Sequence, residues 1–94
     1  MIPGITDKEF EIIKNILDKY EGEFYAYGSR VKGDFSDLSD LDILVKSENY
    51  EQIISNLKYE FDQSLLPYIV NFADFHSMDN HFYNLIKYSL VRIK

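Results

Sequence analysis

Apolar side chains recur along the chain with two different periods, and these periods predict helices and strands. Segments in which apolar residues return every three or four positions have the pattern of a helix with one buried face, and they are 6–20, 48–62 and 78–90. Short segments rich in aromatic and β-branched residues predict strands, and they are 23–27, 41–46 and 68–75. A further short helix is expected at 29–33, between the first two strands.

Polar residues and glycines beside these segments indicate where the helices begin and end. Thr6 followed by Glu9 has the form of a capping box, and Gly22 suits the left-handed end of the same helix. Ser47 and Ser77 are expected to cap the second and third long helices. The last helix is expected to bury a face made of Phe82, Leu85, Ile86 and Ser89.

The order of the elements predicts the class of fold. Helices and strands alternate along the chain, which is typical of an α/β (α+β) domain. We expect a small three-stranded mixed sheet with helices packed mainly on one face. On this prediction the 94 residues, 1–94, form a single domain.

The composition excludes several classes of function. Sixteen acidic and ten basic residues leave a net charge of −6, which argues against direct nucleic-acid binding through a basic face. The chain contains no cysteine, so it forms no disulfide and no cysteine-based zinc site. No apolar run reaches the ~18–20 residues of a membrane span and the N-terminus has no signal-peptide pattern, so we expect a soluble cytoplasmic protein.

Gly28-Ser29 stands where the first strand ends and the short helix begins. Glycine lets the backbone approach a ligand closely, and the start of a helix presents unpaired N–H groups that suit phosphate oxygens. Arg30 is a further candidate for phosphate contact, although it could instead pair with Asp34 and Asp37. The alternative for Ser29 is that it only caps the short helix.

Asp40 and Asp42 stand one residue apart at the start of the second strand. Strand alternation puts both carboxylates on one face, where they repel each other. Mg²⁺ (or Mn²⁺) would relieve that repulsion, because it prefers carboxylate oxygens and keeps open positions for substrate phosphates. The alternative is that the pair is only the solvated polar edge of a strand.

The string Tyr-Gly-Ser-Arg-Val-Lys-Gly, followed by Ser-Asp-Leu-Asp-Ile, resembles the signature of the DNA polymerase β-like nucleotidyltransferase superfamily. Ten residues separate Gly28-Ser29 from Asp40, as in that signature, and nearly the whole chain is similar to the minimal nucleotidyltransferases (MNT). The resemblance implies that Gly28, Ser29 and Arg30 bind the phosphates of ATP and that Asp40 and Asp42 are catalytic and bind the metal ion. It also implies a HEPN-domain protein as partner, with this chain as antitoxin of a toxin–antitoxin pair.

Asn71 departs from the superfamily pattern, which the resemblance implies would place a third carboxylate there. An amide carries no charge and is a poor base for deprotonating a hydroxyl. Asp74 lies three residues further on, so strand alternation turns it away from Asn71 and makes it an unsuitable substitute. His76 and His81 are five residues apart without a third ligand nearby, and we interpret them as surface residues.

Two hypotheses remain open. The chain is either a Mg²⁺-dependent enzyme that transfers AMP from ATP to a protein hydroxyl, or a catalytically weak module of the same fold that neutralises a HEPN partner by contact. Asn71 is the residue that motivates the second. Transfer to a small molecule is a weaker third possibility, because 94 residues leave no room for a second domain that holds the acceptor.

Overall fold

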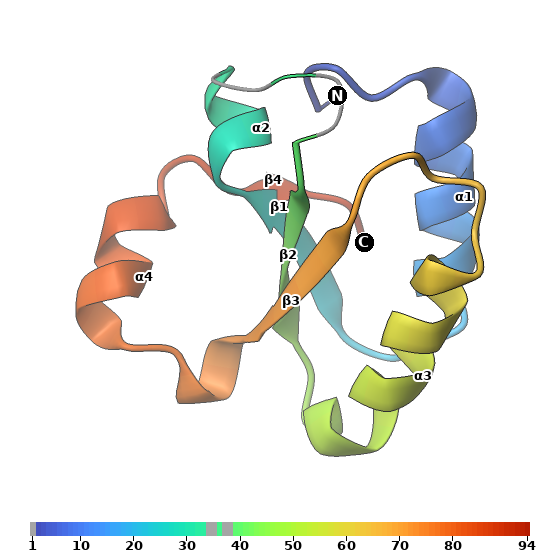
Figure 1. Ribbon diagram of the computed structural model, residues 1–94. Coiled ribbons are helices and arrows are strands. Elements are labelled where there is room, and N and C mark those ends of the chain that lie inside the picture. Colours follow the sequence, from blue (N-terminus) through green and yellow to red (C-terminus); the bar gives the residue numbers. More distant parts are fainter. Residues whose placement is uncertain (1, 34–35, 37–38) are drawn as a thin grey trace.

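The computed structural model describes residues 2–33, 36 and 39–94, and it contains helices and strands in the expected alternation (Figure 1). The helices and strands, in chain order, are α1 (Asp7–Leu17), β1 (Glu23–Tyr27), α2 (Ser29–Lys32), β2 (Leu41–Lys46), α3 (Tyr50–Asp62), β3 (Val70–Asp74), the 3₁₀ turn η1 (Phe75–Ser77), α4 (Asn80–Ile86) and β4 (Val91–Arg92). Both strands that flank Gly28-Ser29 and the acidic pair therefore have the predicted bounds. None of the helices in these residues is long and apolar enough to cross a membrane.

The strands form one mixed sheet of four strands in the order β3-β2-β1-β4. The central strand β1 runs antiparallel to β2 and to β4, whereas β2 and β3 are parallel. The expectation of three strands was wrong. The sequence pattern missed the fourth strand, β4, because it is only two residues long. It pairs Arg92 with Tyr25 and Val91 with Ala26, and two residues are too few to show a sequence period.

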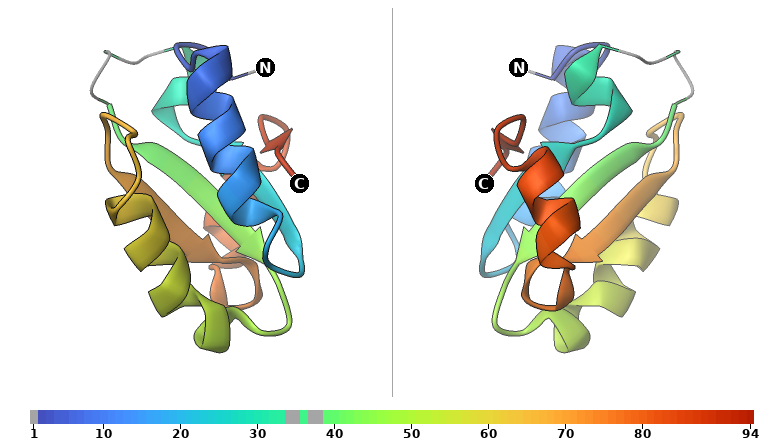
Figure 2. Two further views of the ribbon diagram at one scale, coloured as in Figure 1. Left: turned by 90° about the vertical axis from the view of Figure 1, so that its right-hand side faces the viewer. Right: turned by 90° about the vertical axis from the view of Figure 1, so that its left-hand side faces the viewer.

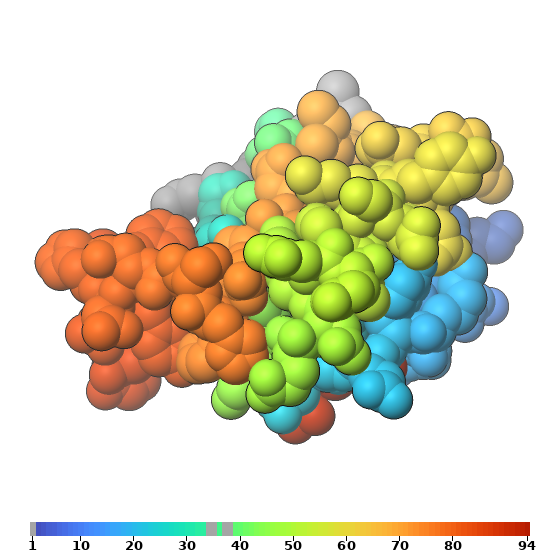
Figure 3. Space-filling model, turned by 90° about the horizontal axis from the view of Figure 1, so that it is seen from below, coloured from blue at the N-terminus to red at the C-terminus, as the bar shows by residue number. Residues whose placement is uncertain are grey.

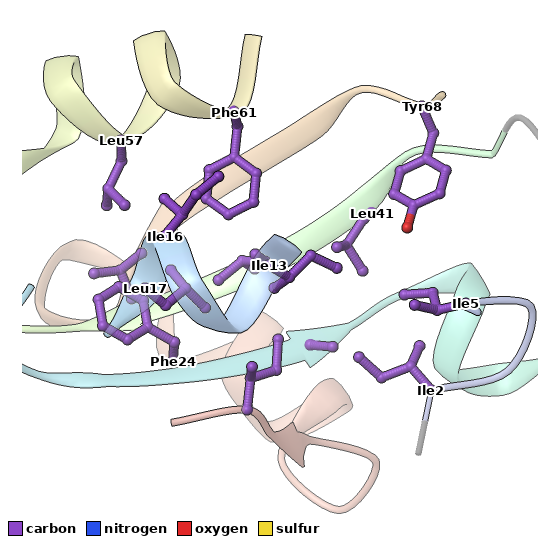
Figure 4. Close-up of a cluster of buried hydrophobic side chains, with 14 residues drawn as sticks. Ile2, Ile5, Ile13, Ile16, Leu17, Phe24, Leu41, Leu57, Phe61 and Tyr68 are labelled. Carbon is purple, nitrogen blue, oxygen red and sulfur yellow. The ribbon is translucent and has the colours of Figure 1, made fainter. Parts of the chain in front are cut away.

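Helices cover both faces of the sheet. The long helices α1 and α3 lie on one face and the short α4 lies on the other (Figure 2). The core between the sheet and the two long helices is a cluster of fully or nearly fully buried apolar side chains (Figure 4). Phe24, Ile43 and Val45 contribute to it from β1 and β2, while Leu44 points to the α4 side and is buried there.

The first helix begins as predicted and ends earlier. The Thr6 side chain accepts from the Glu9 backbone N–H and Glu9 accepts from that of Thr6, which confirms the capping box. The helix ends at Leu17, however, and not at Gly22. The ammonium group of Lys94 donates hydrogen bonds to the carbonyl oxygens of Leu17 and Tyr20. A residue 77 positions away in the sequence thus satisfies the end of the helix, and no local pattern predicts such a contact.

The caps of α3 and α4 differ from those expected. Asn49 is the N-cap of α3, and the Ser47 hydroxyl accepts a hydrogen bond from the Asn49 backbone N–H. Asp79 caps α4, because Ser77 lies in η1 and donates its hydroxyl to Asp74. Each helix therefore begins two residues later than the sequence pattern predicts.

The expected buried face of the last helix is only partly buried. Ile86 is 4% exposed, but Phe82 is 41% and Leu85 is 65% exposed. Seen from below, the orange segment that contains α4 forms a lobe at one side of the molecule (Figure 3). The helix ends at Ile86, whose carbonyl accepts from both the backbone N–H and the hydroxyl of Ser89. It is thus too short and too peripheral to bury the whole predicted face.

Candidate active site

The ends of three strands bring the candidate residues to one edge of the sheet. In the antiparallel pair, Tyr27 at the end of β1 lies opposite Asp42 near the start of β2. In the parallel pair, Asp42 lies opposite Asn71 of β3. The Asp42 carboxylate therefore has Gly28, the residue after Tyr27, on one side and Asn71 on the other.

Asp40 and Asp42 converge on one amide group. The Nδ2 of Asn71 donates to Oδ2 of Asp40 at 2.9 Å and to Oδ1 of Asp42 at 3.2 Å. Two carboxylates that share one donor group lie on the same side of the strand, as strand alternation predicts. Asp40 and Asn71 are exposed and Asp42 is half-buried, so a ligand can reach this side of the pair.

Gly28 is in close contact with Asp42. Its backbone has φ +87° and ψ −157°, a conformation that is essentially restricted to glycine. A Cβ atom built on Gly28 would lie 2.5 Å from Oδ2 of Asp42. Both the backbone angle and the available space therefore require glycine between β1 and α2.

Ser29 is exposed as the first residue of α2. Gly28 is the N-cap of this helix and no side chain makes a capping bond, so the alternative in which Ser29 caps the helix is wrong. Gly33 ends the helix with φ +86°, as its position in the sequence predicts. The Ser29 hydroxyl is left at the surface, one residue from the contact between Gly28 and Asp42.

Arg30 does not occupy the position expected of a phosphate ligand. Its side chain is fully buried, with Nε donating to the Ser39 carbonyl oxygen at 2.9 Å and Nη1 to that of Gly4 at 3.5 Å. The guanidinium also lies 4.1 Å from the centre of the Tyr68 ring. The expectation that Arg30 touches the nucleotide is corrected on this point, because the residue joins the N-terminal segment, α2 and the start of β2 from inside the protein. Its suggested acidic partners Asp34 and Asp37 lie outside the described residues.

The surroundings of Asp42 disfavour its charged form. Burial raises the pKa of Asp42, the hydrogen bond from Asn71 opposes that rise, and the nearby charge of Asp40 adds to it. Burial and the charge of Asp42 likewise raise the pKa of Tyr27, whose ring packs edge-on against Phe82 of α4 at 6.1 Å. A cation bound beside Asp42 would favour the charged carboxylate.

The donor set fits a hard divalent cation. Asp40 and Asp42 present carboxylate oxygens, the ligands that Mg²⁺ and Mn²⁺ prefer, on one accessible side of the sheet. In the described part of the chain no three His, Cys, Asp or Glu residues are grouped so that they could hold a metal ion. The acidic ligands found at this edge are therefore a pair, with the neutral Asn71 as third neighbour.

The remaining candidates lie elsewhere. Asp74 pairs in register with Val45, and its carboxylate accepts from the His76 backbone N–H and the Ser77 hydroxyl, so it caps η1. His76 and His81 are exposed, as expected of surface residues. The sequence did not predict two features of the site. One is the double hydrogen bond of Asn71, and the other is Tyr27, for which only its place next to Gly28 was a signal.

Two comparisons with known proteins bear on the kind of domain that carries this site. Residues 10–92 match the model of the family described as nucleotidyltransferase domain. The chain is also similar to a protein of Haemophilus influenzae named probable protein adenylyltransferase MntA. The two are 33% identical over 87 aligned positions, and the match covers 88% of this chain and 76% of the relative.

Proposed function

Because this chain belongs to the nucleotidyltransferase domain family, we propose that it transfers AMP from ATP to a hydroxyl group on a protein partner. The name of the Haemophilus relative, a probable protein adenylyltransferase, supports both the nucleotide and the class of acceptor. We take the partner to be a HEPN-domain protein for which this chain is the antitoxin, which is what the resemblance to minimal nucleotidyltransferases implies.

The convergence of Asp40 and Asp42 on one side of β2, beside Gly28, is the observation that carries this proposal. In the reaction the acceptor oxygen forms a bond to the α-phosphorus and gives up its proton to solvent, the bond from that phosphorus to the bridging oxygen breaks, and pyrophosphate leaves. Asp40 and Asp42 would hold Mg²⁺ or Mn²⁺, whose charge offsets that of the phosphates. Gly28 and Ser29 would lie against the phosphates, because this turn combines a close backbone approach with an exposed hydroxyl.

Asn71 favours a second candidate function, a module that neutralises the partner by contact with little catalysis. The amide stands where a third carboxylate would act as base, and it cannot accept the proton of the attacking hydroxyl. In this case the carboxylate pair would still bind a metal–nucleotide. The two candidates differ in transfer rate and not in nucleotide binding.

The test measures transfer of label from ATP labelled in its α-phosphate to a HEPN-domain protein encoded beside this chain. Asp42→Asn is expected to abolish transfer, because it removes one of the two charged ligands. Asp62→Asn is the matched control, since it makes the same change at an exposed position at the end of α3. Undiminished transfer by Asp42→Asn would exclude the proposed site.

Asn71→Asp distinguishes the two candidates. If the natural chain transfers no label and Asn71→Asp does, the contact module is the better description. If the natural chain itself transfers label at many turnovers per minute, the enzyme is the better description.

A further inference from the structure

Asn71 places a neutral group between the two acidic ligands of the site. A primary amide nitrogen has two N–H donors, and here one points to Asp40 and the other to Asp42. The register puts this amide directly beside Asp42 on the neighbouring strand. It therefore relieves the repulsion between the carboxylates and adds no negative charge.

The site offers few ligands to a second divalent ion. If a metal–nucleotide occupies the site, its ion is held by phosphate oxygens and by Asp40 and Asp42. A second ion ~3.5–4 Å away would repel the first with four times the energy of two unit charges. To offset that repulsion it would need a further anionic ligand, and among the described residues no third His, Cys, Asp or Glu is grouped with Asp40 and Asp42 to supply it.

No other described acidic side chain is placed to supply that ligand. Asp74 is the acidic residue of β3, but both of its carboxylate oxygens accept hydrogen bonds from residues of η1. It stands opposite Val45, three positions along the strand from the level of Asp42 and Asn71. The neighbour that stands closest to both ligands is thus the uncharged Asn71.

We propose that this site binds one divalent ion per chain together with the nucleotide, because the neutral residue at position 71 supplies no ligand charge for a second. The proposal rests on the proposed function, because it takes the acidic pair to be the metal–nucleotide site. It adds the number of ions and the residue that sets that number. One ion can hold the triphosphate and offset part of its negative charge, whereas the attacking hydroxyl is left without an ion of its own.

The experiment counts the Mn²⁺ bound per chain by equilibrium dialysis, as the metal content of the protein compartment in excess of that in the opposite compartment, where free Mn²⁺ and free nucleotide are the same. It is done with a saturating ATP analogue that has a methylene group between the α- and β-phosphorus, so that no transfer occurs. The variants are Asn71→Asp, Asn71→Ala and the control Asn15→Asp, which adds the same charge at an exposed position on α1, on the opposite face of the sheet. Thermal unfolding followed by circular dichroism checks that each variant is folded.

We expect one Mn²⁺ per chain in the natural protein, in Asn71→Ala and in Asn15→Asp, and two in Asn71→Asp. A second ion in the natural protein or in Asn71→Ala would overturn the proposal, and so would a single ion in folded Asn71→Asp. If Asn71→Asp does not fold, the natural protein and Asn71→Ala decide the question by their own counts. Absence of Mn²⁺ and nucleotide from every folded variant would contradict the proposed function itself and this proposal with it.

Discussion

Replacing Gly28 with alanine tests the contact on which the site is built. Gly28 has φ +87° and ψ −157°, and a Cβ at this position would lie 2.5 Å from Oδ2 of Asp42. Alanine therefore strains the backbone and also displaces the carboxylate. The displaced Asp42 weakens its 3.2 Å hydrogen bond with Asn71.

The expected loss of stability is the sum of these two effects. A residue other than glycine in this backbone region costs about 1–3 kcal/mol. The weakened hydrogen bond adds about 1 kcal/mol, which makes the total about 2–4 kcal/mol. Gly33→Ala is the matched control, because Gly33 has nearly the same φ, +86°, but no described atom lies within 4 Å of the place its Cβ would take. Its backbone penalty alone is about 1–2 kcal/mol.

The assay is urea unfolding of the natural chain and both variants, followed by titration with Mn²⁺ and ATP. Gly28→Ala should lose more stability than Gly33→Ala by about 1–2 kcal/mol, which is about 5–15 °C in melting temperature for a domain of this size. Only Gly28→Ala should lose Mn²⁺ and ATP binding. Equal losses of stability, together with intact binding in Gly28→Ala, would refute the claim that the approach of Asp42 requires glycine.

Two further predictions concern Asp42 and Arg30. Asp42 has a pKa raised above its ordinary value of 3.8, mainly by burial, so the stability of the fold decreases as the pH rises from that ordinary value to the folded pKa and stays lower above it. Asp42→Asn should therefore raise the free energy of unfolding at neutral pH and leave it nearly unchanged at about pH 2, where both forms are neutral. Urea unfolding at the two pH values checks this, and an equal effect at both would contradict it. Arg30→Ala should lower the free energy of unfolding by about 2–4 kcal/mol, because it removes buried hydrogen bonds and the stacking on Tyr68. A variant with natural stability and weakened ATP binding would instead show that Arg30 contacts the phosphates.

Local patterns were sufficient for much of the fold. The strands at 23–27 and 41–46 and the capping box at Thr6 follow from side-chain period and from hydrogen bonds three residues apart. The spacing of Gly28-Ser29 and the acidic pair could be read in the same way, since both lie at the ends of strands that the side-chain period predicts. These features depend on residues that are close together in the chain, so the sequence pattern predicts them.

Other features depend on residues that are distant in the chain. Lys94 donates to carbonyl oxygens at the end of α1, the two-residue β4 completes the sheet, and α4 leaves Phe82 and Leu85 exposed. Arg30 looked like a phosphate ligand because it follows Gly28-Ser29, and only the packing of Tyr68 and the N-terminal segment shows that it is inside. In a helix of only four residues, such as α2, no local pattern shows whether an arginine side chain will be buried or exposed.

The candidate site also combines features that the local sequence determines with features that depend on distant residues. By itself the sequence determined the types of its residues: a glycine at the turn, two carboxylates on one face of a strand, and an asparagine where a third carboxylate was expected. Only the tertiary structure decided that the Asn71 amide stands between Asp40 and Asp42, 31 and 29 residues away in the chain. The register of β3 against β2 sets that contact, and register depends on how both faces of the sheet pack, which no single segment of the chain encodes.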